Sequence, residues 1–399
     1  MSTTTTSTTL PVETGVWRAI PAGPLSPRVL ALAVWTGEEL VVVGGYDDDP
    51  CLLTRESDGA GGGSGSRSAV YCFAIKSVVT DGAAFDPEAG RWRQITTPPV
   101  PLTRSTASAV AHGGIVYILM GPQPGAFLAY HPADDRWEHL PPPATRGTLV
   151  EAGDRLALFK YQDPEGDTDL WFDGTDQEVA PDLLFDPETK EWFEIPPDPL
   201  IPSWDRSMVW TGTELVLLGV KLAPYPSSAP SLYRAAVFDP GKGTWRLLPD
   251  SNLVITGGNR TWYFADGRLI NPSLGSSDGG DTNPYDRAYP QGGILDVETG
   301  EWLPLPDPPA NPYIPGTFIG YAAGSPSRYL SGYGWLFDPV TGQWESLPAP
   351  PDNSSIPVPR NGSAVLFAGP DLVVWGGFLY GDDGRGEMVS TGWMWRPGG

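Results

Sequence analysis

Five arginines precede a turn glycine by nine or seven residues. Because these two spacings differ by two, they place the arginines on the same face of a strand. The residues at this position are Arg28, Arg104, Arg146, Arg260 and Arg360. Arg206 lies six residues before its glycine and is out of phase. Clustered guanidinium groups select planar anions such as carboxylates. The five arginines are therefore predicted ligand-binding residues; the alternative is a structural role, in which each pairs with an acidic residue of a neighbouring unit.

Other chemistry-bearing groups are sparse. Only three histidines are present, and none falls in a segment expected to carry a site. The acidic residues between positions 163 and 169 alternate as in a calcium loop, but Thr168 replaces the required glycine and Gly174 the final glutamate. No catalytic residue, metal site or cofactor is predicted, and a binding role is favoured over an enzymatic one.

Six repeated segments must position these residues. Each has an aromatic residue or leucine, usually Asp-Pro, a short polar turn and a tryptophan seven residues after the start. The segments are Phe85 to Trp92, Tyr130 to Trp137, Phe185 to Trp192, Phe238 to Trp245, Leu295 to Trp302 and Phe337 to Trp344. Aspartate caps such a turn, proline presets φ, and glycine then supplies positive φ, so each segment predicts a β-hairpin.

Each hairpin is the second half of a four-stranded unit, because an apolar run, a glycine turn and a β-branched run precede it. The repeated tryptophans, beginning with Trp17, lie 42 to 75 residues apart and indicate seven units. The strand around Trp17 lacks a partner, and the strand ending at Trp395 lacks a successor. We therefore predict an all-β, seven-bladed β-propeller of four-stranded antiparallel blades, closed by pairing the N-terminal and C-terminal strands. A six-bladed ring with one unit misread is the alternative.

The hairpins from Phe185 to Trp192 and from Phe337 to Trp344 resemble the aromatic-to-tryptophan half of the Kelch repeat, as in the propeller of the galactose oxidase central domain. The double glycine of that family stands at Gly44-Gly45 and Gly376-Gly377 but is missing at Lys160-Tyr161. The third, fifth and sixth units are therefore the weakest assignments. Copper-dependent members need histidine ligands at the channel mouth, which this chain does not supply.

In such a ring, one face carries the loops between blades and the loops that join the second strand of a blade to its third. Five insertions fall on this face. They span residues 46–68, 161–179, 221–231, 271–291 and 380–388. Aromatic residues within them, predicted to bind a ligand over this face, are Tyr46, Trp171, Tyr285 and Tyr380. Long insertions cost little closure entropy, and their repetition on one face suggests recognition; neutral decoration is the alternative.

Charge limits the partners. The 25 Lys and Arg residues against 48 Asp and Glu give a net charge of −23, which disfavours nucleic acid and anionic membranes. No apolar run is long enough to span a bilayer. The Thr-rich residues 1–13 are expected to be a flexible segment before a single domain at 14–397. Such spacers often follow an export signal or anchor, so an extracellular or cell-surface monomer is expected, with a cytoplasmic location as the alternative.

Cys51 and Cys72 are the only cysteines and border the same Gly/Ser-rich insertion. A disulfide between them would close the insertion and contribute about 3 kcal/mol in the chain-entropy model. Two unpaired thiols are the alternative.

Three functions remain open. The leading hypothesis is a non-catalytic module that binds a protein, peptide or glycan over the insertion-rich face. The second, implied by the Kelch resemblance, is a metal-independent sugar-acid mutarotase or epimerase whose channel arginines hold a carboxylate. The third is a structural extracellular repeat protein.

Overall fold

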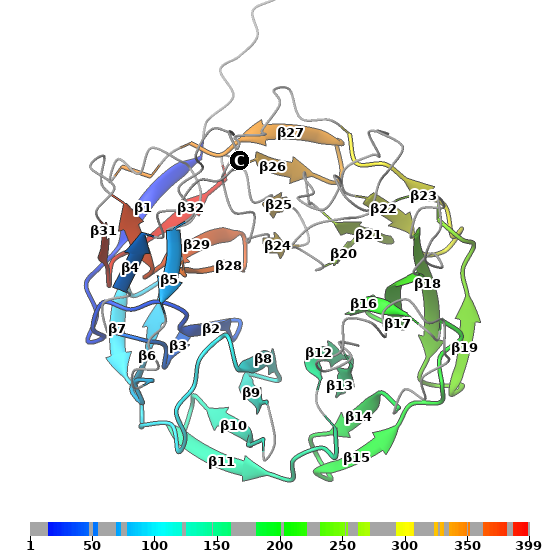
Figure 1. Ribbon diagram of the computed structural model, residues 1–399, viewed down its shortest axis with the longest axis horizontal. Helices are drawn as coiled ribbons and strands as arrows, with labels where there is room; N and C mark the ends of the chain where they lie inside the picture. The colour runs from blue at the N-terminus through cyan, green and yellow to red at the C-terminus, as the bar shows by residue number, and fades with distance from the viewer. Residues whose placement is uncertain are drawn as a thin grey trace, which may run out of the picture.

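The protein folds into a ring of seven four-stranded antiparallel sheets, with two additional two-stranded ribbons (Figure 1). None of the residues described by the computed structural model lies in a helix. These residues are 15–47, 51–54, 69–72, 78–121, 125–145, 147–160, 181–200, 203–221, 232–251, 253, 262–271, 293–306, 323–325, 328–330, 335–348, 350–351, 362–380 and 386–397.

Blades 1 to 4 each contain four strands in chain order from the centre outward, and blade 1 carries the first ribbon between its second and third strands. Blade 1 is β2 (Leu32–Trp35), β3 (Leu40–Val43), β6 (Gly82–Asp86) and β7 (Arg91–Gln94), and its ribbon is β4 (Cys51–Thr54) and β5 (Ala69–Cys72). Blade 2 is β8 (Ala107–His112), β9 (Ile115–Met120), β10 (Phe127–His131) and β11 (Arg136–Leu140). Blade 3 is β12 (Thr148–Ala152), β13 (Arg155–Phe159), β14 (Leu183–Asp186) and β15 (Glu191–Glu194). Blade 4 is β16 (Trp204–Trp210), β17 (Leu215–Lys221), β18 (Leu232–Asp239) and β19 (Thr244–Leu247).

Blades 5 and 6 repeat this order, whereas blade 7 takes its outermost strand from the start of the chain. Blade 5 is β20 (Tyr263–Ala265), β21 (Arg268–Asn271), β22 (Gly293–Asp296) and β23 (Trp302–Leu303). Blade 6 is β24 (Ala323–Ser325), β25 (Arg328–Leu330), β26 (Trp335–Asp338) and β27 (Gln343–Ser346). Blade 7 is β28 (Ala364–Ala368), β29 (Asp371–Trp375), β32 (Gly392–Arg396) and β1 (Val16–Ile20), and its ribbon is β30 (Phe378–Tyr380) and β31 (Gly386–Met388). The predicted seven-bladed β-propeller is therefore confirmed.

The repeated hairpins explain the seven-residue spacing. The first aromatic and the tryptophan are direct cross-strand partners, as in Phe85↔Trp92 and Phe337↔Trp344, and their ring centroids lie 5.1 and 4.9 Å apart. In five of the six hairpins the aspartate after the first residue accepts backbone N–H bonds, and His131 stands at this position in the sixth; Asp86 Oδ1, for example, accepts two at 2.9 Å. The spacing thus places one aromatic pair in five of the six hairpins, and in the sixth Leu295 stands opposite Trp302.

Seven indole bonds connect the blades around the ring. Each repeat tryptophan donates from Nε1 to a backbone carbonyl just after the outer strand of the preceding blade, over 2.6 to 2.9 Å. The pairs are Trp92→Pro21, Trp137→Thr96, Trp192→Pro141, Trp245→Pro196, Trp302→Pro249, Trp344→Pro306 and Trp17→Pro348. The seventh bond closes the circle.

Closure also joins the two ends of the chain. β1 pairs with β32 in antiparallel register, with Trp17 opposite Trp395. The Asp371 carboxylate, whose side chain is 3% exposed, accepts bonds from Arg396 at 2.7 Å and from Arg18 at 3.3 Å. An arginine on each terminal strand therefore pairs with one carboxylate of the blade they complete.

The hydrophobic core is divided among the junctions between blades. Seven clusters of buried hydrophobic residues are found in the described part of the chain, one for each pair of neighbouring blades. At the junction of blades 7 and 1, for example, Trp375 and Met394 pack with Val42 and Phe85. Blade-on-blade burial therefore stabilises the ring.

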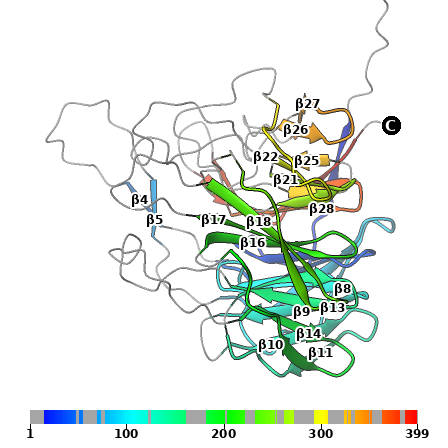
Figure 2. The same cartoon turned by 90° about the vertical axis from the view of Figure 1, so that its right-hand side faces the viewer.

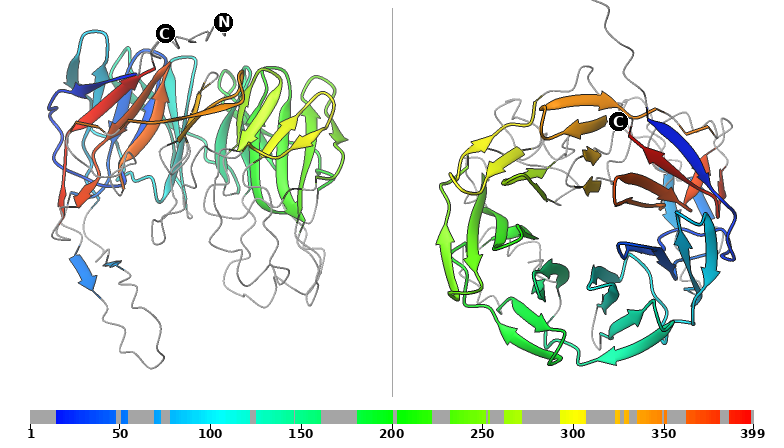
Figure 3. Two further views of the ribbon diagram at one scale, coloured as in Figure 1. Left: turned by 90° about the horizontal axis from the view of Figure 1, so that it is seen from above. Right: turned by 180° about the vertical axis from the view of Figure 1, so that it is seen from behind.

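The two faces of the ring differ. The turns that join first to second strands and third to fourth strands lie on one face, here called the turn face. The opposite face, here called the insertion face, carries residues 28–29, 44–46, 376–377 and 389 together with both ribbons. Figures 2 and 3 show the β4–β5 ribbon standing away from the ring on this side, opposite the C-terminal end.

Candidate functional site: the insertion face

The two ribbons rise from either side of one dipeptide. Val29 and Tyr46 exchange backbone hydrogen bonds of 2.9 Å, just before the β4–β5 ribbon. On the other side, the Gly377 amide donates to the Arg28 carbonyl at 2.8 Å, and the Arg28 amide donates to the Val389 carbonyl at 3.4 Å. Gly377 directly precedes β30 and Val389 directly follows β31. The bases of both ribbons are therefore held by Arg28–Val29.

The Arg28 side chain fixes this base from inside. Its side chain is fully buried, and Nε donates to the Ser26 carbonyl at 3.0 Å. The two Nη atoms donate to the Ser26 hydroxyl at 2.8 Å, to the Gly44 carbonyl at 3.1 Å and to both Asp81 oxygens at 2.6 and 3.0 Å. These bonds use all five N–H groups of a guanidinium. In this arrangement Arg28 supports the face and has no donor left for a ligand.

Arg104 contacts both blade 1 and blade 7, which come from opposite ends of the chain. Its amide donates to the Leu30 carbonyl of blade 1 at 3.0 Å, and its Nη1 donates to the Ser363 carbonyl of blade 7 at 2.7 Å. The other three arginines predicted to line the channel mouth, Arg146, Arg260 and Arg360, lie outside the described residues. The five-arginine site stays a prediction, and the two members described both hold the insertion face together.

A third arginine, Arg206, forms a buried charge cluster between blades 3 and 4. Its Nη atoms bind Asp182 at 2.7 and 3.2 Å and Asp198 at 2.8 Å, and Nη1 also donates to the Lys160 carbonyl at 3.3 Å. The side chains of Arg206, Asp182 and Asp198 are 1%, 4% and 5% exposed. The buried Nε of Arg206 has no hydrogen-bond partner among the described residues. One guanidinium thus holds two carboxylates in the interior.

A β-bulge explains why sequence spacing put Arg206 out of phase. Trp204 pairs with Val220 and Ser207 with Leu218, so strand β16 holds one more residue than its partner over this stretch. A bulge of this kind changes strand parity and redirects a side chain. Spacing from the turn glycine cannot reveal that extra residue.

Burial shifts the pKa values of two groups at this cluster. Desolvation raises the pKa of Asp198 and outweighs the opposing attraction of Arg206. Desolvation likewise lowers the pKa of Lys160, although Asp182 partly opposes it. A carboxyl with a raised pKa can exchange protons nearer neutrality, but here it is buried and bonded to Arg206. The contacts support a structural role for the cluster, in which it attaches the segment before β16 to blade 3.

The predicted aromatic residues are only partly placed. Tyr46 is half-buried at the base of the β4–β5 ribbon, and Tyr380 ends β30. Trp171 and Tyr285 lie outside the described residues. In the β4–β5 ribbon, Cys51 stands directly opposite Cys72. Directly opposed antiparallel residues have Cα separations within the range of a disulfide, and the disulfide itself stays a prediction.

Metal-binding groups are not assembled in the described ranges, where no three His, Cys, Asp or Glu side chains lie close enough to hold an ion. The calcium-like segment at 163–174 is outside those ranges. No long apolar helix suited to crossing a membrane occurs in the described part of the chain.

A scan against profiles of known protein families finds no match for this chain, and a search of curated proteins finds none either. The β-propeller is therefore established by geometry, and the Kelch resemblance stays a prediction.

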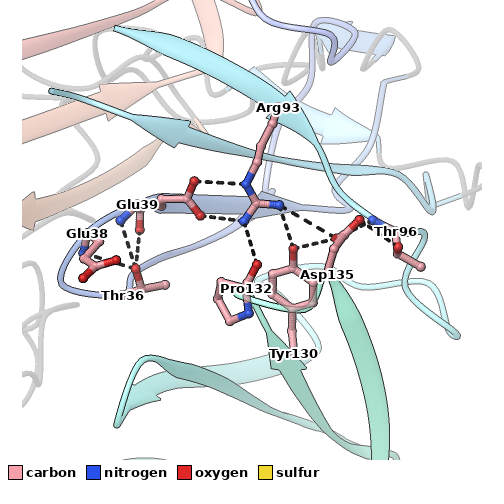
Figure 4. A network of polar contacts seen from close by, with 8 residues as sticks. All are labelled: Thr36, Glu38, Glu39, Arg93, Thr96, Tyr130, Pro132 and Asp135. Carbon is pink, nitrogen blue, oxygen red and sulfur yellow. Dashed lines mark hydrogen bonds and ion pairs between the residues drawn. The ribbon is translucent and has the colours of Figure 1, made fainter. Parts of the chain in front are cut away.

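A second polar network lies on the turn face, between blades 1 and 2 (Figure 4). Arg93 binds Glu39 through Nε at 3.0 Å and Nη2 at 2.5 Å, and its Nη1 donates to the Tyr130 hydroxyl at 3.2 Å. That hydroxyl donates to Asp135 Oδ1 at 2.8 Å. Asp135 also accepts bonds of 2.9 Å from the amide and hydroxyl of Thr96.

The network arises from three departures from the repeat. Tyr130 replaces the phenylalanine found at four of the other repeats, Thr96 replaces proline, and Asp135 stands with positive φ where four other hairpins have glycine. Thr96 therefore has an N–H to satisfy, and Asp135 satisfies it. Because the polar groups named here bind one another, the contacts indicate a clamp between two blades, not a ligand site.

Proposed function

We propose that this protein is a non-catalytic recognition module that binds a protein, peptide or glycan over the insertion face. A β-propeller is compatible with such a role. The observation that carries the proposal is the pair of ribbons rising from adjacent blades and joined at their bases by Arg28–Val29. A rigid base that presents extended elements in one direction is a common arrangement for recognition.

The internal contacts of Arg28 and Arg206 favour this reading over a carboxylate-binding enzyme. The Nη atoms of Arg28 and Arg206 donate hydrogen bonds to carboxylates and carbonyls of the protein itself. A mutarotase or epimerase would need arginine donors that reach the substrate. That alternative therefore depends on Arg104 together with the three arginines outside the described residues.

The proposal is tested by screening the chain against glycan, peptide and protein arrays and then changing the face. Tyr46→Ala, Trp171→Ala, Tyr285→Ala and Tyr380→Ala variants are expected to weaken the affinity for the bound ligand, at least tenfold for the strongest. Matched controls are Leu247→Ala and Leu303→Ala, which truncate apolar side chains 47% and 38% exposed on outer strands. Equal affinity for the ligand across all six variants would show that another surface binds it.

Acceleration of sugar-acid epimerisation or mutarotation, followed by proton-exchange NMR with sialic and uronic acids, would instead favour the enzymatic alternative. Absence of any ligand from the arrays, together with absence of that acceleration, would favour a purely structural role.

A further inference from the structure

The β4–β5 ribbon has an unusual edge. Among the described residues it is a two-stranded sheet with no third strand, and its two strands read Cys-Leu-Leu-Thr and Ala-Val-Tyr-Cys. Protein edge strands are usually blunted by charge, proline or a covering element, because their outward N–H and C=O groups pair readily with another chain. These eight residues include neither a charge nor a proline. Within the described part of the chain, the edges of this ribbon therefore have the features that favour strand addition.

The surroundings of the ribbon are acidic. Asp47, Asp48 and Asp49 lie shortly before β4 in the sequence and are separated from it by Pro50. The second ribbon, whose base shares Arg28–Val29, contains Glu387 in β31, and the sequence between its two strands includes Asp382 and Asp383. Acidic residues outnumber basic ones in both ribbon segments, and the whole chain carries a net charge of −23. This charge repels a second copy of the chain and attracts a cationic partner.

We propose that the insertion face binds an extended, basic polypeptide segment, which adds as a third strand to the β4–β5 ribbon. Main-chain hydrogen bonds supply affinity, and the acidic residues beside both ribbons select lysine- or arginine-bearing sequences. The inference rests on the proposed recognition function and names its partner chemistry.

Synthetic peptides test the strand pairing. The probe is a fluorescent alternating Thr-Lys peptide, compared with a Thr-Glu peptide and with Thr-Lys peptides methylated on every amide or on every second amide. We expect the Thr-Lys peptide to bind at least tenfold more tightly than the Thr-Glu peptide. Full methylation should abolish binding, whereas alternate methylation, which leaves one edge intact, should retain most of it. Equal binding of the fully methylated peptide would overturn strand addition.

Protein variants locate the edge and the charge. Leu52→Pro and Leu53→Pro are compared because alternate residues present their N–H groups to opposite edges. At least one is expected to weaken peptide binding tenfold without changing the melting temperature, since the ribbon lies outside the blades. Asp47→Asn with Glu387→Gln should also weaken binding, most clearly at low salt. Glu188→Gln with Glu191→Gln removes the same charge from the turn face and should have no effect.

The outcomes separate this inference from the function on which it rests. If no Thr-Lys peptide binds, or if the ribbon variants bind it with unchanged affinity, the inference of a basic peptide partner is wrong. An array ligand whose affinity depends on Tyr46 and Tyr380 would still support the recognition function. If sedimentation shows a dimer that Leu52→Pro or Leu53→Pro dissociates, the occupant is a second copy of the chain and the inference is wrong. If the arrays are also empty, both proposals fall.

Discussion

Trp17 Nε1 donates a hydrogen bond of 2.7 Å to the Pro348 carbonyl, although the two residues are 331 positions apart. The six other repeat tryptophans make the corresponding bond over much shorter separations, such as the 49 positions between Trp245 and Pro196. The indole-to-carbonyl hydrogen bond therefore joins the two ends of the chain only at the junction of blades 6 and 7.

Replacing Trp17 by phenylalanine should weaken that closure. The variant Trp17→Phe keeps an aromatic ring but removes the indole donor, so we expect a loss of about 1 kcal/mol in the free energy of unfolding. Trp245→Phe is the matched control, with the same chemical change inside the ring. Hydrogen exchange should accelerate in β1 and β32 for Trp17→Phe and should not do so there for Trp245→Phe. Identical exchange in the two variants would contradict a special closing role.

Asp371 should contribute to closure through both chain ends. Asp371→Asn removes the charge that pairs with Arg18 and Arg396, and we expect the free energy of unfolding to fall by about 1 to 2 kcal/mol. This loss is smaller than that for breaking a fully buried ion pair, because both arginine side chains are more than half exposed and can be solvated. A double-mutant cycle with Arg396→Gln should show coupling. Additive effects of the two substitutions on the urea midpoint would argue that the contact contributes nothing.

Asp198 should lower stability as the pH rises. Burial raises its pKa above the ordinary 3.8, so the folded state retains a proton that the unfolded chain has released. The free energy of unfolding contributed by this group therefore falls as pH increases from about 3.8 through the raised pKa. Asp198→Asn should remove this decline while keeping an acceptor for Arg206.

Urea unfolding from pH 4 to 8 measures that difference. The stability of Asp198→Asn relative to the natural protein should increase over the lower part of this range and then level off. Asp250→Asn is the control, since that carboxylate is 72% exposed and pairs with Arg234 at the surface. A constant difference across the range would contradict the assigned direction.

Asp135 should behave in the opposite sense. Desolvation opposes its charge, but bonds from Thr96 and Tyr130 and the attraction of Arg93 together lower its pKa below 3.8. The resulting stability is present above that value and is lost as pH falls through the lowered pKa. Asp135→Asn should therefore lose less stability on acidification than the natural protein. Tyr130→Phe, which removes one of the bonds, should shift the profile part of the way, and an unchanged acid profile in both variants would contradict the clamp.

Blade architecture was predictable because its signals are local. The spacing of Phe85 and Trp92, like that of Phe337 and Trp344, is set by a two-strand register and by a turn that is specified by Asp, Pro and Gly. Turn chemistry and strand alternation operate over a few residues, so one sequence can display them directly. The sequence leaves one strand at each end of the chain without a partner, and pairing these two strands closes the ring.

The site was less predictable because its contacts cross between units. The phase of Arg28 predicted a position at the start of an inner strand, and the residue lies four positions before β2. Phase could not show that Asp81, 53 positions away, binds its guanidinium. Arg206 was set aside by spacing, and the bulge in β16 brought it to Asp182 and Asp198. The two ribbons were expected only as insertions.

By itself the amino-acid sequence determined the repeat, the number of blades and the pairing of the chain ends, since these follow from short-range turns and from the need to hide strand edges. The tertiary structure alone decided which arginine meets which carboxylate and that Arg28–Val29 links two ribbons. Those contacts depend on how closely neighbouring blades approach and on single-residue bulges, and neither quantity is contained in residue spacing.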